Sequence, residues 1–173
     1  MNRDISLPGG GNFSDMYKRN INMIYRISLL HLKVQADAED AVQSVFLKYL
    51  KASPSFKDYE HEKAWFITAT KNHCRDVLKG WWHSKKKDSD IPEASTEFSY
   101  GSEGEITEQL MKLPEKYKDV LYLYYYEEYS IKEISAILKR NESTIRTQLC
   151  KGRERLKKRI DNREVHYEER TIY

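Results

Sequence analysis

Cysteine is scarce in this 173-residue chain: Cys74 and Cys150 are the only two, and neither belongs to a CxxC or Cys/His spacing typical of zinc sites. A disulfide or a structural metal is therefore not expected. The chain also lacks an apolar run of roughly 18 residues, and its first residues lack the apolar stretch of a signal peptide. We expect no membrane insertion and a cytoplasmic location.

Phosphate-binding glycine loops and clusters of metal ligands are missing as well. The adjacent pair His73 and Cys74 would diverge by about 100° on a helix, which does not suit a base and its nucleophile. The sequence therefore predicts a protein that is not an enzyme and that needs no cofactor. Its content of 39% hydrophobic and 33% charged residues is typical of a folded chain rather than a disordered one.

Charge is unevenly distributed along the chain, although the net charge is only +3. Residues 63–87 carry seven Lys or Arg and one acid, and residues 139–159 carry nine Lys or Arg and two acids. Between them, residues 88–105 carry six acids and no base. Two basic blocks separated by an acidic strip favour two contacts with a polyanion, most commonly nucleic acid. Two solvated helix faces are the alternative interpretation.

Apolar residues recur with helical periodicity, and no run of alternating β-branched and polar residues is present. We predict an all-α protein of two small helical domains joined by a flexible linker, with a helix-turn-helix in the second domain. The predicted parts are a flexible tail at 1–12, a first domain at 13–83, an acidic linker at 84–105, a second domain at 106–162 and a tail at 163–173.

Three helices are predicted in the first domain, at about 14–31, 37–52 and 62–79. The second has Asp37 as a suitable N-cap and ends before Ser53 and Pro54. Its apolar positions are Ala38, Ala41, Val42, Val45, Phe46, Tyr49 and Leu50. The third carries Lys71, Arg75 and Lys79 at four-residue intervals, which predicts a basic stripe along one face.

The segment 130–159 predicts two short amphipathic helices. Ser130 and Glu133 form the S-x-x-E pattern of a capping box, and the sequence at 139–141 interrupts the apolar period. A second helix then begins, capped by Asn141 or Ser143. This arrangement is typical of a helix-turn-helix, whose second helix enters the major groove, where Arg can bond to guanine and Gln to adenine. A helical hairpin that packs against a partner protein is the alternative.

The segment 113–158, which opens Leu-Pro and contains Ser-x-x-Glu-Ile and Thr-Ile-Arg, resembles region 4 of the extracytoplasmic-function (ECF) sigma factors of bacterial RNA polymerase. The segments DAEDAVQSVFLKYL (37–50) and AWFITATKNHCRDVLK (64–79) resemble region 2 of the same family. The two resemblances occur in the family's order and together span about residues 13–160. They imply a factor that binds core RNA polymerase and directs initiation at promoters, and they imply an anti-sigma factor as a further partner.

The resemblance also implies a role for particular residues. Those expected to bind RNA polymerase are Asp37, Asp40, Gln43 and Phe46, although the two acids could serve only the helix end and Phe46 could belong to the core. Those expected to bind single-stranded minus-10 DNA are Lys71, Asn72, Arg75, Lys79, Trp81 and Trp82, although the tryptophans could instead close the helical bundle. Those expected to bind minus-35 DNA are Thr144, Arg146, Thr147, Gln148, Lys151 and Arg153, with Arg146 and Gln148 at base edges.

The chain departs from the family at the turn between the last two helices. The family usually has Gly followed by an apolar residue there, whereas this chain has Lys139 and Arg140. A left-handed Lys costs about 1 kcal/mol relative to Gly. Arg140 could weaken the packing or add a phosphate contact. The rival function is a stand-alone helix-turn-helix regulator, which leaves the basic and aromatic block before the linker unexplained.

Overall fold

The computed structural model describes the backbone of residues 13–85 and 101–170, and the side chains of residues 13–82 and 106–161. The chain divides into two compact units, Met1–Thr96 (unit 1) and Glu97–Tyr173 (unit 2). Every element in the described residues is a helix, which confirms the prediction of an all-α protein with two helical domains. The predicted tail 1–12 and most of the predicted linker lie outside the described residues.

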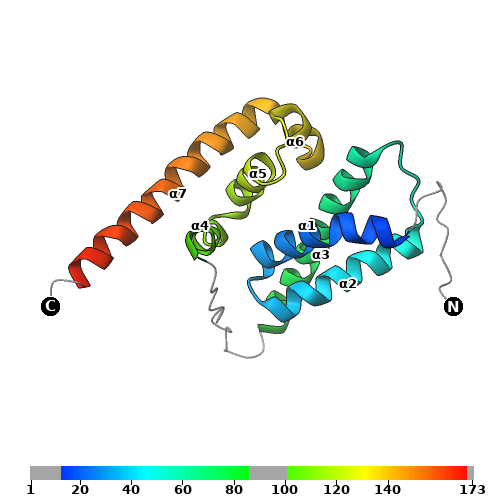
Figure 1. Ribbon diagram of the computed structural model, residues 1–173, viewed down its shortest axis with the longest axis horizontal. Helices are drawn as coiled ribbons and strands as arrows, with labels where there is room; N and C mark the ends of the chain where they lie inside the picture. Colours follow the sequence, from blue (N-terminus) through cyan, green and yellow to red (C-terminus); the bar gives the residue numbers. More distant parts are fainter. Residues whose placement is uncertain (1–12, 86–100, 171–173) are drawn as a thin grey trace. The chain divides into compact units, whose positions relative to one another are not determined.

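Unit 1 contains three helices, α1 (Phe13–Leu32), α2 (Gln35–Ala52) and α3 (Tyr59–Lys85). Each of them packs against the other two, as Figure 1 shows. Phe66 on α3 is fully buried, and its ring centroid lies 5.4 Å from those of both Phe46 and Tyr49 on α2. Trp65 packs edge-on against Phe66 at 5.1 Å. Aromatic pairs of this kind add about 0.5–1.5 kcal/mol each beyond the area they bury, so this cluster joins α2 firmly to α3.

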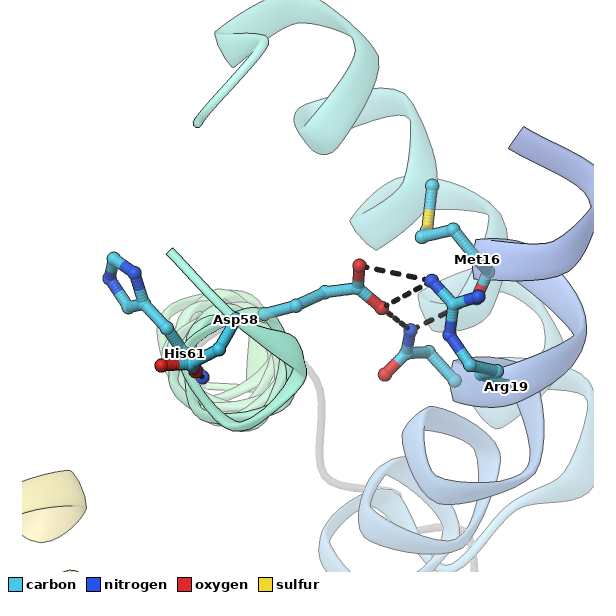
Figure 2. Close-up of polar contacts among 6 residues, drawn as sticks. Met16, Arg19, Asp58 and His61 are labelled. Atoms are coloured by element: carbon cyan, nitrogen blue, oxygen red, sulfur yellow. Dashed lines mark hydrogen bonds and ion pairs between the residues drawn. The ribbon is translucent and has the colours of Figure 1, made fainter. Parts of the chain in front are cut away.

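A buried polar network joins α1 to the first turn of α3 (Figure 2). The Asn20 amide donates to Glu62 Oε1 at 2.7 Å and to the Met16 carbonyl at 2.9 Å. The Arg19 guanidinium donates to both carboxylate oxygens of Glu62 at 3.2 Å. Asn20 and Glu62 are 0% and 9% exposed, so these bonds compensate groups that have lost water. The network sets how α3 begins against α1.

The third helix is longer at both ends than the predicted range of about 62–79. It begins earlier because Asp58 acts as its N-cap, with a carboxylate that accepts a hydrogen bond from the His61 N–H at 2.8 Å. It ends later because Gly80 does not interrupt it. A helical Gly costs only about 1 kcal/mol relative to Ala. Val77, Leu78 and Trp81, which flank it, pack against buried residues of unit 1 and offset that cost.

Unit 2 contains α4 (Gly101–Met111), α5 (Glu115–Tyr125), α6 (Ile131–Leu138) and α7 (Glu142–Arg170). The last helix packs on α4, α5 and α6, and α5 also packs on α6. Pro114 stands directly before α5. Two of the elements exceed the predicted domain limits of 106 and 162: α4 begins at Gly101, and α7 runs to Arg170 because residues 161–170 contain no proline or glycine.

The core of unit 2 lies where α7 crosses α5 and α6. Ile134 on α6 and Ile145 on α7 are both fully buried, and Leu149 follows one turn later at 3% exposure. Gly152 continues this buried side of α7, and a Cβ there would lie only 3.1 Å from the Leu121 side chain. The absence of a side chain at position 152 therefore lets α7 approach α5 closely.

The Glu62 network generates a stability prediction. We expect Glu62→Ala to lower the free energy of unfolding of unit 1 by about 1–3 kcal/mol, because it removes one of the two acceptors of the buried Asn20 amide and the ion-pair partner of Arg19. Urea unfolding followed by tryptophan fluorescence measures this, since Trp65, Trp81 and Trp82 all lie in unit 1. Glu60→Ala, in the same first turn but exposed, is the matched control. Equal stabilities of the two variants would contradict the role of the network.

Candidate nucleic-acid interface

The basic stripe on α3 ends in an exposed tryptophan. Arg75 and Lys79 are exposed and Lys71 is half-buried. Because α3 continues without a break to Lys85, Trp82 falls seven residues after Arg75 and therefore on the same face. Its side chain is 77% exposed. A cationic track that leads to a free aromatic face is suited to a nucleic-acid backbone and a stacked base.

The two adjacent tryptophans have different environments. Trp81 is half-buried and packs against the buried cluster of Leu32, Ala41 and Cys74, whereas Trp82 points into solvent. Successive residues of a helix diverge by about 100°, so both rings could not share the basic face. The structure thus places Trp81 in the packing of unit 1 and Trp82 beside the stripe.

Asn72 lies next to the stripe and is tied to it. Its side-chain oxygen accepts a hydrogen bond from Arg75 at 2.9 Å, which holds the guanidinium along the helix surface. Burial lowers the pKa of the neighbouring His73, an effect that Asp76 partly offsets. His73 is therefore neutral near pH 7 and adds no charge to this face.

The residues exposed on α2 differ from those that were predicted to bind RNA polymerase. Asp40 and Gln43 are exposed on it, but Phe46 is only 5% exposed and packs among Phe13, Tyr17 and Phe66. The prediction of Asp37 as the N-cap is wrong, because α2 begins at Gln35 and Asp37 therefore lies inside the first turn, where it is half-buried. There its charge still favours the positive end of the helix dipole.

Two leucines complete the exposed face of α2. Leu47 is 55% exposed and Leu50 is 39% exposed, and they lie four and seven residues after Gln43. Leu47 is not among the residues predicted to bind a partner, and Leu50 was predicted as one of the apolar positions that face the core. Leu47 interrupts the otherwise polar outer positions of this helix, and that irregularity is the signal that could have identified it.

The capping box at the start of α6 is confirmed. The Glu133 N–H donates to Ser130 Oγ at 3.3 Å, and the Ser130 N–H donates to Glu133 Oε2 at 2.8 Å. Hydrogen bonds from the Ser130 side chain and backbone lower the pKa of Glu133, which keeps its carboxylate ionised at the positive end of the helix. The first helix of the pair therefore begins at a defined residue.

The turn between α6 and α7 is closed by a left-handed residue. Lys139 has φ 52° and ψ 49°, as expected from its place in the family's glycine position. Its N–H bonds to the Ala136 carbonyl at 3.4 Å, and the Arg140 N–H bonds to the Ser135 carbonyl at 3.0 Å, which is the pattern of a Schellman motif. The Ser135 hydroxyl also donates to the Arg140 carbonyl at 2.6 Å. These bonds compensate for the missing glycine.

The predicted minus-35 residues do not share one face of α7. Thr144, Arg146, Thr147, Lys151 and Arg153 are exposed, but Gln148 is half-buried. Arg146 and Gln148 are two positions apart and therefore project to opposite flanks, about 160° from each other.

The start of α7 decides between the two predicted caps. The helix begins at Glu142, so Asn141 occupies the N-cap position and Ser143 lies inside the first turn.

The charged residues of α7 have partners within the helix and beside it. Arg146 pairs with Glu142 at 3.0 Å, one turn earlier, and both side chains remain accessible at 61% and 42%. The Arg153 guanidinium lies 5.7 Å from the Tyr124 ring centroid and 5.6 Å from that of Tyr125. Arg146 is thus free to exchange its surface pair for another acceptor, while Arg153 is held against α5.

Within the residues that the structure describes, no helix is both long and apolar enough to cross a bilayer. In the same part of the chain, no three His, Cys, Asp or Glu side chains are grouped so that they could hold a metal ion.

Comparison with known families matches the two units separately. The family model for sigma-70 region 2 matches residues 16–83, and that for sigma-70 region 4 matches residues 103–156. RNA polymerase sigma factor SigV of Bacillus subtilis (strain 168) is 29% identical over 134 residues, which cover 74% of this chain and 78% of that protein. ECF RNA polymerase sigma factor SigM of the same strain is 29% identical over 156 residues, which cover 83% and 91%.

Solved structures show the same fold at low sequence identity. A chain in the co-crystal structure of the sigma factor RpoE with the anti-sigma factor NepR from Bartonella quintana has a TM-score of 0.74 at 18% identity, with 86% of this chain and 96% of that chain covered. A chain in the structure of CnrH with the cytosolic domain of CnrY has a TM-score of 0.61 at 17% identity, with 87% and 88% covered.

The left-handed turn residue generates a second prediction. We expect Lys139→Gly to raise the free energy of unfolding of unit 2 by about 0.5–1 kcal/mol, because glycine adopts this conformation without the steric cost that Lys carries. Urea unfolding followed by far-UV circular dichroism measures the change, with tryptophan fluorescence as the separate report on unit 1. Lys132→Gly, at an exposed position inside α6, is the control and should lower stability by about 1 kcal/mol. A loss of stability in both variants would show that the Lys139 side chain stabilises the turn.

Proposed function

Because this chain belongs to the ECF sigma factors of bacterial RNA polymerase, we propose that its two units divide promoter recognition between the exposed faces of α2, α3 and α7. A sigma factor directs promoter-specific initiation, so the chain is an initiation factor and not itself the polymerising enzyme. The observation that carries the assignment is that region 2 and region 4 both match, in this order, in one chain. A stand-alone regulator would need only the second.

The exposed face of α2 is the proposed contact with core RNA polymerase. It presents Asp40 and Gln43 beside Leu47 and Leu50, with Asp37 at its edge. Acids surrounding exposed leucines suit a basic partner surface that also buries apolar area, as the centres of protein interfaces do. Phe46 supports this face from the core side, through its contact with Phe66 at 5.4 Å.

The basic stripe of α3 is the proposed contact with the minus-10 element. In this proposal Lys71, Arg75 and Lys79 follow the backbone of the separated strand, and Asn72 orients Arg75. Trp82 offers its exposed ring to a base, and such stacking contributes about 1–3 kcal/mol per base. Trp81 holds the end of α3 on unit 1 so that Trp82 faces outward.

The outer face of α7 is the proposed contact with the minus-35 duplex. Arg146 is the candidate for a base edge, because its guanidinium is accessible near the beginning of the helix. Thr144, Thr147 and Lys151, which are exposed, are the candidates for contacts with the flanking phosphates. Arg153 is a weaker candidate, since its guanidinium already lies over two tyrosine rings.

The neighbouring structures support a regulatory partner. RpoE and CnrH are each seen with a second protein, NepR and the cytosolic domain of CnrY respectively. We infer an anti-sigma factor as a partner of this chain, and we infer a cytoplasmic location because its polymerase and DNA partners are there.

Reconstitution with polymerase tests the function. We expect the purified chain with bacterial core RNA polymerase to initiate transcription at a recurring pair of minus-35 and minus-10 sequences selected from DNA with a randomised upstream region. Sequence-specific duplex binding by the free chain without any effect on core polymerase would instead establish the stand-alone regulator.

A substitution in α2 tests the polymerase contact. Leu47→Gln should weaken holoenzyme assembly roughly fivefold or more, as expected when an interface residue that contributes about 1 kcal/mol or more is lost. Lys48→Gln, the next residue on α2 but on another face, is the matched control.

A substitution in α7 tests the minus-35 contact. With the selected promoter, we expect Arg146→Ala to cost about 1–3 kcal/mol in holoenzyme binding and to relax the preference at one base pair. The measurement is the affinity for the selected promoter and for its single-base variants at fixed salt. Glu142→Ala removes the surface partner of Arg146 but leaves the guanidinium, so it should preserve that preference. Equal losses of Arg146→Ala on every sequence would make Arg146 a phosphate contact.

A further inference from the structure

The Arg140 side chain turns toward the other helices of unit 2 and is only 27% exposed. Its Nη1 donates to Gln148 Oε1 on α7 at 3.0 Å and to the Lys116 carbonyl on α5 at 3.5 Å. Its Nη2 lies 4.0 Å from Asp119 Oδ2 on α5. One side chain in the turn thus connects the helix before the helix-turn-helix with the helix that reads DNA.

Asp119 explains why this position carries a cation. Its carboxylate is 2% exposed, and a buried carboxylate is costly unless a positive or hydrogen-bonding group compensates it. An apolar residue in the turn, as the family usually has, would bring no charge toward Asp119. Arg140 therefore brings a cation to within 4.0 Å of a buried carboxylate, at a position where the family usually has an apolar residue.

Gln148 is constrained by the same guanidinium. An arginine carries only donors, so the Gln148 atom that faces Arg140 must be the amide oxygen. Bidentate recognition of adenine needs the oxygen as acceptor together with the amide NH₂ as donor. The bond from Arg140 occupies one of the two lone pairs of that oxygen, and it holds the half-buried Gln148 amide against the turn instead of directing it toward a base edge.

We propose that Arg140 is a positioning residue that sets the angle of α7 by bridging Asp119 and Gln148, and that Gln148 therefore does not read adenine. This inference rests on the proposed function, in which α7 enters the minus-35 duplex. It assigns the departure from the family's turn to a partly buried bridge within unit 2 instead of an additional phosphate contact. A phosphate contact would need the guanidinium to leave acceptors on α5 and α7 that it already holds.

Unfolding of the free full-length chain tests the bridge without DNA. The variants are Arg140→Met, Asp119→Asn and the two combined. We expect Arg140→Met to lower the midpoint of thermal unfolding of unit 2 by roughly 4–8 °C. Faster hydrogen exchange of the backbone amides of α6 and α7 should show that the loss of stability lies in unit 2. The combined variant should lose less than the sum of the single losses, because both single changes remove the same contact between Arg140 and Asp119. Additive losses would overturn the bridge between Arg140 and Asp119.

Holoenzyme binding to the selected promoter tests the positioning role. The affinities for the selected promoter and for DNA of scrambled sequence are measured well below the unfolding temperature. Arg140→Met should reduce the ratio of these two affinities roughly fivefold or more, and Arg140→Lys should reduce it less. The dependence of affinity on salt should stay as in the unaltered protein. Lys151→Met is the comparison, because loss of a phosphate contact weakens binding on all sequences and lowers the salt slope by about one.

The results that overturn the proposal are distinct. A salt slope that falls in Arg140→Met as it does in Lys151→Met would make Arg140 a phosphate contact, and an unchanged specificity ratio would leave it a purely structural residue. Gln148→Ala should leave the base preference at every minus-35 position within about twofold. Relaxation at a single adenine would show that Gln148 reads it. If no promoter is selected at all, the proposed function fails, while the unfolding experiment still decides whether the bridge exists.

Discussion

When a helix buries one stripe of apolar side chains, the directions in which its other side chains point are fixed as well. In unit 1, burial of Val45 and Phe46 on α2 leaves Asp40, Gln43 and Leu47 facing solvent. In unit 2, burial of Ile145, Leu149 and Gly152 on α7 does the same for its basic side. The surfaces assigned to polymerase and DNA are thus consequences of where the cores lie.

The buried polar contacts act where apolar packing alone leaves the helix angle undetermined. Apolar contacts are not directional, whereas a hydrogen bond fixes both distance and angle. The bonds of Glu62 with Arg19 and Asn20 set the start of α3, the helix that carries the basic stripe. The bridge from Arg140 has the same place in unit 2, between α5 and α7. In each unit, a polar link therefore lies beside the helix that is proposed to touch DNA.

Much of the fold and part of the site could be predicted from periodicity and local chemistry. The capping box at Ser130 and the left-handed Lys139 are properties of a few adjacent residues, and both are as predicted. The end of α3 was not predicted, because Gly80 has a low helix propensity. The helix continues beyond Gly80 because neighbouring side chains, Trp81 among them, pack against the core. For the same reason the sequence left Trp81 and Trp82 equivalent, and their environments differ.

By itself, the sequence determined the all-α class, the helix-turn-helix and the two basic blocks, because these depend on spacing along the chain. Only the tertiary structure decided which member of each set faces outward. Gln148 and Arg146 both look suited to bases as residue types, yet Arg140 engages the first and leaves the second accessible. Whether a side chain is available to a partner depends on contacts between residues far apart in sequence, such as Arg140 with Asp119, and no local pattern encodes them.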